Sequence, residues 1–239
     1  MPYKRPDGRK PDELRATKIT RNFTKNAAGS VLIECGDTRV ICTASIEDRV
    51  PPFRNRDTEG WLTAEYGMLP GSTNSRKRRD KDGRGTEIQR LIGRAVRNIV
   101  NLNAWPGHTI YLDCDVIQAD GGTRTASITG AYVALADAVK ALDKDGLITG
   151  QALLDSVAAI SVGIIDKTVL LDLNYIEDYS AEVDMNIVMT GSGNLVEVQG
   201  TGEKGTFTER QLTRLVKVAR KGIGELKEIQ EKALRKRLR

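Results

Sequence analysis

One stretch near the middle of the chain, residues 113–130, constrains the fold more than any other. It reads DCDVIQADGGTRTASITG, and it predicts a strand, then a sharp glycine corner, then the first turns of a helix of small residues. Glycine reaches backbone conformations that other residues avoid, so the chain can turn tightly at Gly121 and Gly122 and come close to a ligand. A helix that begins directly behind such a corner presents unpaired N–H groups and the positive end of its dipole. The stretch is therefore suited to binding an anion.

Two readings of this corner stay open on local sequence alone. Arg124 adds a planar, permanently charged group that matches phosphate oxygens. A Gly-Gly turn between a strand and a helix is, however, often only a turn. The corner lacks the Gly-Lys-Ser/Thr of a Walker loop and the spacing of a dinucleotide fingerprint. A free or terminal phosphate therefore fits it better than the di- or triphosphate of a nucleotide.

Composition sets wide limits on the rest of the chain. The 239 residues could form one large domain or two small ones, and nothing in the composition divides them. The net charge of +5 permits a nucleic-acid partner without requiring one. Three cysteines in apolar runs predict buried thiols rather than a disulfide framework or a zinc site. The N-terminus has no apolar leader, and no apolar run approaches the ~20 residues of a membrane span, so we expect a cytoplasmic protein.

Periodicity predicts an α+β fold made of two similar β-α halves, with mixed sheets packed on helices, within a single domain. A basic, extended arm (1–21) precedes halves at about 22–142 and 151–239; a solvated tail is the plainer reading of that arm. The first half shows a hairpin, an amphipathic helix, a strand and a small-residue helix (30–35 with 38–46, 88–102, 110–116 and 125–142). The second shows a hairpin, two strands and a helix that opens on a capping box (157–165 with 168–173, 181–190, 194–199 and from 208).

The region between the first hairpin and the first helix, residues 47–84, shows no periodicity and is expected to be a long loop. It ends in six basic residues within nine positions (76–84), which would attract a polyanion, although a solvated charge run explains them almost as well. Arg90, Arg94 and Arg97 would form a basic stripe on the helix, for which solvation is the favoured reading. Arg84 differs because it lies at the helix start, where a cation is unfavourable unless an anion is present.

Carboxylates gather in the second half, at residues 172–186. Asp178 is expected in a turn, and Asp184 on the polar face of a strand together with Glu182 and Asn186. Asp178 and Asp184 could converge as a general acid and its partner, or bind a divalent cation. A charged alternation is more often the solvent-facing edge of a sheet. Only a phosphate site nearby would reverse that preference.

Taken together, these residues resemble the ribonuclease PH family, the phosphate-dependent 3′ exoribonucleases of bacteria. The resemblance runs over essentially the whole chain and rests on six blocks in the family's order: RPDGR (5–9), GWLTAEYGMLP (60–70), EIQRLIGR (87–94), the stretch at 113–130, DMN (184–186) and EVQGT (197–201). Small departures at 71–75 and 201–206 concern the path of RNA rather than activity. The resemblance implies a ribonuclease PH-like fold of two β-α units, similar to the β-α-β units of ribosomal-type proteins.

The same resemblance implies a function and a set of roles. Inorganic phosphate would attack the last phosphodiester of an RNA and release a nucleoside diphosphate, in reverse adding nucleotides. The RNA would be the 3′ end of tRNA precursors, with rRNA as a further substrate, and the protein would form a homohexamer, a trimer of dimers. Arg84, Gly122, Thr123 and Arg124 would hold the phosphate, and Asp178 and Asp184 would bind Mg²⁺ or protonate the leaving 3′ oxygen. The candidate RNA-binding residues are Arg76, Arg78, Arg79 and Arg90.

Two other functions remain open at this point. One is a catalytically silent RNA-binding subunit of an exosome-like ring; retention of both arginines and both aspartates argues against it. The other is a small-molecule phosphotransferase that uses only the glycine corner and has no affinity for RNA.

Overall fold

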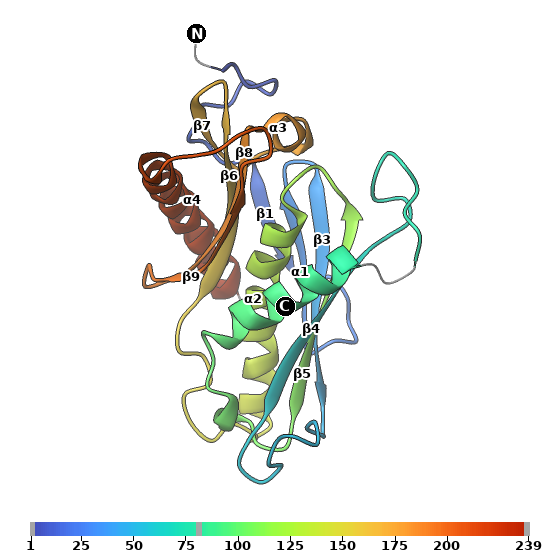
Figure 1. The fold of residues 1–239 in the computed structure, drawn as a ribbon. Helices are drawn as coiled ribbons and strands as arrows, with labels where there is room; N and C mark the ends of the chain where they lie inside the picture. The colour runs from blue at the N-terminus through green and yellow to red at the C-terminus, as the bar shows by residue number, and fades with distance from the viewer. Residues whose placement is uncertain (1–2, 80–82, 237–239) are drawn as a thin grey trace.

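Two β-sheets lie on either side of a long helix, α2 (Thr123–Lys144), in the computed structural model of the chain (Figure 1). The structure describes residues 3–79 and 83–236, so the middle of the predicted basic run, residues 80–82, lies outside the described residues. The first sheet has the order β1-β2-β3-β5-β4 and the second the order β7-β6-β8-β9. Within the described residues, no helix is both long and apolar enough to span a membrane.

The first sheet is built around the predicted hairpin, β2 (Gly29–Cys35) and β3 (Thr38–Glu47), whose strands pair antiparallel. β5 (Thr109–Gln118) pairs antiparallel with β3 and buries alternate residues, as its sequence predicts. The edges are β1 (Thr17–Arg21), which pairs with β2, and β4 (Trp61–Met68), which runs parallel to β5. This sheet is mixed, as expected, and the described strands of the second sheet all pair antiparallel.

Helix α2 owes its central place to its small residues. It packs on β2, β3 and β5 on one side and on β6 on the other. A side chain at Gly130 would put its Cβ 2.8 Å from Cys42 Sγ, and one at Gly29 would put its Cβ 1.9 Å from the carbonyl oxygen of Ala134. The helix and the sheet are therefore in backbone contact, which fixes where the N-terminus of α2 lies.

The second sheet is sandwiched between helices. β6 (Val157–Ile165) is buried along its whole length because α2 covers one face and α4 (Glu209–Arg235) the other. β7 (Thr168–Leu171) and β8 (Val183–Thr190) flank β6, and β9 (Leu195–Thr201) is the far edge. The capping box predicted at Thr208 opens α4, as the sequence indicates.

Helix α1 (Gly83–Arg97) buries one face, against β4 and α2. The predicted pattern ran to Leu102, but the helix ends at Arg97 and a 3₁₀ turn, η1 (Leu102–Ala104), follows. Ile99, beyond the helix, is still fully buried. The apolar spacing of the sequence therefore continues beyond the C-terminal end of the helix.

Three other expectations are wrong. The loop predicted over 47–84 contains β4, in which Leu62 and Ala64 are buried against α1 while Glu65 is exposed. The turn predicted at Asp178 is a short helix, α3 (Tyr175–Ser180), opened by a capping box between Asn174 and Glu177. The N-terminal arm is not a solvated tail, because Arg5 and Arg15 are buried in ion pairs and the arm ends in strand β1.

Candidate active site

A cleft of about 710 Å³ opens where β4 and β5 end and where α1 and α2 begin. Both halves of the chain contribute to its walls. All six residues predicted for phosphate binding and catalysis line it: Arg84, Gly122, Thr123, Arg124, Asp178 and Asp184. Arg78 and Arg79 also line it, whereas the other two candidate RNA-binding residues, Arg76 and Arg90, are exposed and lie outside its lining.

The glycine corner takes the shape that the sequence predicts. Gly121 and Gly122 have φ of 74° and 65°, in the left-handed region that favours glycine. A Cβ at Gly121 would lie 2.7 Å from the carbonyl oxygen of Leu173, so a larger residue would collide with the second half of the chain. Gly122 is the N-cap of α2, and the first N–H groups of a helix have no partner within it. The corner thus combines a close backbone approach with a helix N-terminus.

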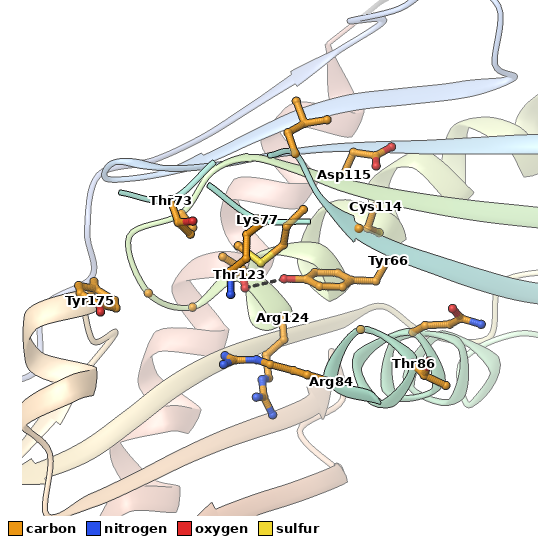
Figure 2. A pocket seen from close by; sticks show the side chains of 18 of the residues that line it. Tyr66, Thr73, Lys77, Arg84, Thr86, Cys114, Asp115, Thr123, Arg124 and Tyr175 are labelled. Atoms are coloured by element: carbon orange, nitrogen blue, oxygen red, sulfur yellow. Dashed lines mark hydrogen bonds between the residues drawn. The ribbon is translucent and has the colours of Figure 1, made fainter. Parts of the chain in front are cut away.

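Two arginines stand at two helix starts beside this corner. Figure 2 shows Arg84, from the first turn of α1, and Arg124, from the first turn of α2, extending into the same part of the cleft. Arg124 Nη1 donates a 2.6 Å hydrogen bond to Gln199 Oε1, whose own amide donates at 2.6 Å to Glu87 Oε1. Two cations at helix N-termini repel each other and oppose both dipoles, and an anion between them would offset both effects.

The carboxylates face the arginines from the second half. Asp178 lies on α3, and Asp184 on β8, an interior strand of its sheet, so the solvent-facing edge considered for this strand is wrong. Burial raises the pKa of Asp184 to about 6, and the charge of Asp178 adds to the rise while Arg124 opposes it. Burial also raises the pKa of Asp178, against the lowering effects of Arg84 and Arg124. The two aspartates therefore interact electrostatically with each other and with the arginines.

The donor set fits a hard divalent cation. Asp184 Oδ1 is buried and has no hydrogen-bond partner in the part of the chain that the structure describes. No group of three or more histidine, cysteine or acidic side chains among the described residues is arranged to hold a metal ion. Mg²⁺ is commonly held by only one or two carboxylates, with water and substrate phosphate completing its octahedron. Asp178 and Asp184 match that pattern, and a protonated Asp184 could equally donate a proton.

Several residues of the cleft escaped the sequence reasoning. The hydroxyl of Tyr66, at the end of β4, lies 2.9 Å from Thr123 Oγ1, drawn as a dashed line in Figure 2. Gln199 orients Arg124, as described above. Both belong to blocks that carried the family resemblance, but no role was attached to them. Burial also raises the pKa values of Asp113 and Asp115, which line the cleft from the outer face of β5.

Two models of one protein family match most of the chain. Residues 13–141 match the model for the 3′ exoribonuclease family, domain 1, and residues 155–222 match the model for domain 2 of the same family. Ribonuclease PH of Corynebacterium kroppenstedtii is 57% identical, over 98% of this chain and 94% of that protein. Ribonuclease PH of Corynebacterium efficiens is 56% identical, over 97% of each chain.

Solved structures agree with the fold. The crystal structure of rice (Oryza sativa) Rrp46 superposes with a TM-score of 0.82 at 21% identity, over 97% of this chain and all of that one. The Archaeoglobus fulgidus exosome with RNA bound to the active site gives a TM-score of 0.81 at 23% identity, over 94% of this chain and 92% of the other. At these identities the likeness concerns the fold, which is the α+β architecture predicted from the sequence.

Proposed function

The chain belongs to the 3′ exoribonuclease family, and we propose that it shortens RNA from the 3′ end by phosphorolysis, with inorganic phosphate as the attacking group. One observation carries this proposal: Arg84 and Arg124 line the same cleft as Asp178 and Asp184, beside the glycine corner. An anion site next to carboxylates suits a reaction in which phosphate is itself the nucleophile.

The reaction needs an anion to approach another anion. A phosphate oxygen attacks the phosphorus of the last phosphodiester, the bond from phosphorus to the 3′ oxygen breaks, and that oxygen leaves with the electron pair and takes up a proton. The products are a nucleoside diphosphate and an RNA that is one nucleotide shorter. Arg84, Arg124 and the N–H groups at Gly122 and Thr123 bind the attacking phosphate and offset its repulsion from the RNA. Each charge-assisted hydrogen bond is worth ~1.5 to 3 kcal/mol.

Asp178 and Asp184 serve the leaving side of the reaction. With a pKa raised to about 6, a small fraction of Asp184 carries a proton at neutral pH and can give it to the leaving 3′ oxygen. The two carboxylates would also hold Mg²⁺, which supplies positive charge to the transferring phosphoryl group when it is bound. The effect of Mg²⁺ on the stability of Asp184→Asn, described below, tests whether Asp184 is a ligand of the metal.

Family membership supports a proposal for the substrate and the assembly. We take the substrate to be the 3′ ends of tRNA precursors and other RNA, with Arg78 and Arg79 at the cleft and Arg76 and Arg90 beyond it as candidate contacts to the RNA backbone. The hexameric ring and the cytoplasmic location expected from the sequence belong to the same proposal. The silent-subunit alternative is not favoured, because relatives of 56–57% identity are ribonucleases PH and the charged residues of the cleft are all present.

The test is to incubate the protein with a 3′-extended tRNA precursor and Mg²⁺, with and without phosphate. We expect shortening only when phosphate is present, with nucleoside diphosphates as products. Shortening without phosphate, or release of nucleoside monophosphates, would contradict phosphorolysis. Binding of the RNA with no shortening in either condition would instead support the silent subunit, and no binding at all would support the small-molecule phosphotransferase.

A further inference from the structure

The N-terminal arm, residues 5–15, is bound into the second half of the chain by buried charges. The Arg5 side chain is completely buried and forms a fork with Glu177, Nε to Oε1 and Nη2 to Oε2, both at 2.7 Å. Its remaining N–H groups donate to backbone carbonyls that include those of Leu171 at 2.8 Å and Asp172 at 2.9 Å. Removing one partner of such a buried pair is strongly destabilising, because it leaves the other charge buried and unpaired. The arm is therefore bound to residues 171–172, which lead into α3, and to α3 itself, the helix that carries Asp178.

Arg15 joins this segment to the glycine corner. Its Nη2 donates to Asp172 Oδ1 at 2.7 Å, and its backbone N–H donates to Asp172 Oδ2 at 2.8 Å. Its Nη1 donates to the carbonyl oxygen of Asp120 at 2.5 Å. Asp172 is buried and has φ of 55°, an unusual conformation for a residue other than glycine. One guanidinium thus links two segments that lie 52 positions apart in the chain, Asp120 and Asp172.

Two side chains, those of Thr38 and Arg15, donate hydrogen bonds to the carbonyl groups of the corner at Gly121 and Asp120. Thr38 Oγ1 donates to the carbonyl oxygen of Gly121 at 2.7 Å and accepts from the backbone N–H of Asp120 at 2.9 Å. Arg15 holds the Asp120 carbonyl, and a Cβ at Gly122 would lie 2.9 Å from Arg15 Nη2. Because each peptide is planar, fixing its carbonyl oxygen also fixes the direction of the N–H in the same plane. These contacts therefore set the orientation of the backbone that faces the cleft.

The corner and α3 also touch directly. The backbone N–H of Tyr175, the first residue of α3, donates to Asp120 Oδ1 at 3.1 Å. Glu177, which Arg5 holds, immediately precedes Asp178. The arm thus contacts both the phosphate corner and the helix of a catalytic candidate, although neither arginine lines the cleft.

We propose that Arg15, paired with Asp172, is a positioning residue of the reaction: it sets the distance and orientation of the phosphate-binding corner relative to Asp178. The proposal rests on the phosphorolytic function above. Arg15 acts through the corner rather than on the phosphate, because it does not line the cleft and its Nη1 and Nη2 groups donate to the Asp120 carbonyl oxygen and Asp172 Oδ1. A lysine at this position keeps the charge, but its single ammonium nitrogen cannot reproduce the fork that reaches both Asp172 and Asp120.

The expected effect is specific to phosphate. Displacement of a bound reactant by about 1 Å can cost on the order of a hundredfold in rate. We expect Arg15→Lys to lower kcat/KM for phosphate by about ten- to a hundredfold, with a higher KM for phosphate, while KM for RNA stays within about twofold. Thr38→Val, which preserves shape and removes only the second tie to the corner, should raise KM for phosphate in the same direction.

The chain offers a matched control in Arg21→Lys. Arg21 also belongs to the N-terminal segment and forks onto a buried carboxylate, Asp137 of α2, and its side chain is as buried as that of Arg15 (6% against 5% exposed). It also donates to carbonyls at the end of α4, including that of Ala233. Neither Arg21 nor Asp137 lines the cleft. Arg21→Lys should therefore lower Tm without changing KM for phosphate.

The experiment measures Tm, KM for phosphate and KM for RNA for the full chain and the three variants. The proposal is supported if Arg15→Lys and Thr38→Val raise KM for phosphate while Arg21→Lys, at a similar loss of Tm, does not. It is overturned if folded Arg15→Lys keeps the wild-type value, or if Arg21→Lys raises it equally. If Arg15→Lys fails to fold, an unchanged value in Thr38→Val overturns it. A wild-type chain that consumes no phosphate would defeat the proposed function and this inference with it, whereas an active wild type with unresponsive variants defeats only the inference.

Discussion

Replacing Asp184 by asparagine should stabilise the protein at alkaline pH while removing its activity. Burial, with the charge of Asp178 in addition, raises the pKa of Asp184 from 3.8 to about 6. The folded state therefore favours the protonated form. The stabilisation from this group is complete below about pH 4 and is lost as the pH rises through about 6. Above pH 6 the ionised Asp184 opposes folding, and a neutral amide at the same place would not.

The size of the effect follows from the shift. A rise of about two pKa units corresponds to about 3 kcal/mol, and water in the open cleft reduces this, so we expect Asp184→Asn to gain ~1 to 3 kcal/mol at pH 8. At pH 4, close to the unfolded pKa of 3.8, the gain should fall to about 0.5 kcal/mol or less. Because we propose that the same residue serves the leaving group or the metal, turnover should fall by about 10² to 10⁴.

The assay is urea unfolding at pH 4 and pH 8 in the presence of a chelator, repeated at pH 8 with Mg²⁺. Mg²⁺ should stabilise the wild type and have little effect on Asp184→Asn. Asp172→Asn is the matched control: its carboxylate is paired with Arg15, so the same substitution should destabilise the protein. Equal changes at the two pH values, or a loss of stability at pH 8, would refute the reasoning about Asp184.

Three further variants, one of them with a matched control, test other parts of the site. Arg124→Ala should raise KM for phosphate by about ten- to 150-fold, the equivalent of one charge-assisted hydrogen bond, in steady-state kinetics with unchanged Tm. Arg94→Ala, which removes an exposed ion pair on the neighbouring helix, should leave that constant unchanged. Gly122→Ala should lower Tm and weaken phosphate binding in calorimetry, because its φ of 65° and the nearby Arg15 side chain oppose a Cβ. A wild-type affinity for phosphate in this variant would show that the corner is not the phosphate-binding site. Changing Arg78 and Arg79 together to glutamine should reduce the log-log salt slope of single-stranded RNA binding by about 1.4, and an unchanged slope would exclude them from the RNA path.

The sequence predicted those elements whose own residues carry the signal. The hairpin of β2 and β3, the alternation in β5 and the capping box of α4 all depend on neighbours within a few positions, and the structure confirms them. The corner at Gly121 and Gly122 was also predictable, since adjacent glycines between a strand and a helix have few other uses.

Elements that depend on distant partners were missed. β4 carries polar residues such as Thr63 and Glu65 on the face away from α1, and it is a strand because β5 pairs with it. α3 is six residues long, too short for a periodic pattern, although the Asn174 to Glu177 capping box was a readable signal.

The arm was misjudged for the same reason. Its composition predicts a solvated, basic segment, yet the partner of Arg5 lies 172 positions away, at Glu177. Nothing in the local sequence distinguishes an arginine that faces solvent from one that is buried against a remote carboxylate. Local sequence could not show the convergence of Arg84 and Arg124 with Asp178 and Asp184 either. The family resemblance suggested it, and only the fold places these side chains in one cleft.

The most direct test of the account follows the attacking group itself. The protein is incubated with a 3′-extended RNA, Mg²⁺ and isotopically labelled inorganic phosphate, and the released nucleotides are separated. Phosphorolysis predicts one label in each nucleoside diphosphate, in its terminal phosphate, at the same rate as the RNA shortens. Unlabelled nucleotides released as the RNA shortens would contradict the claim that phosphate is the nucleophile in this cleft.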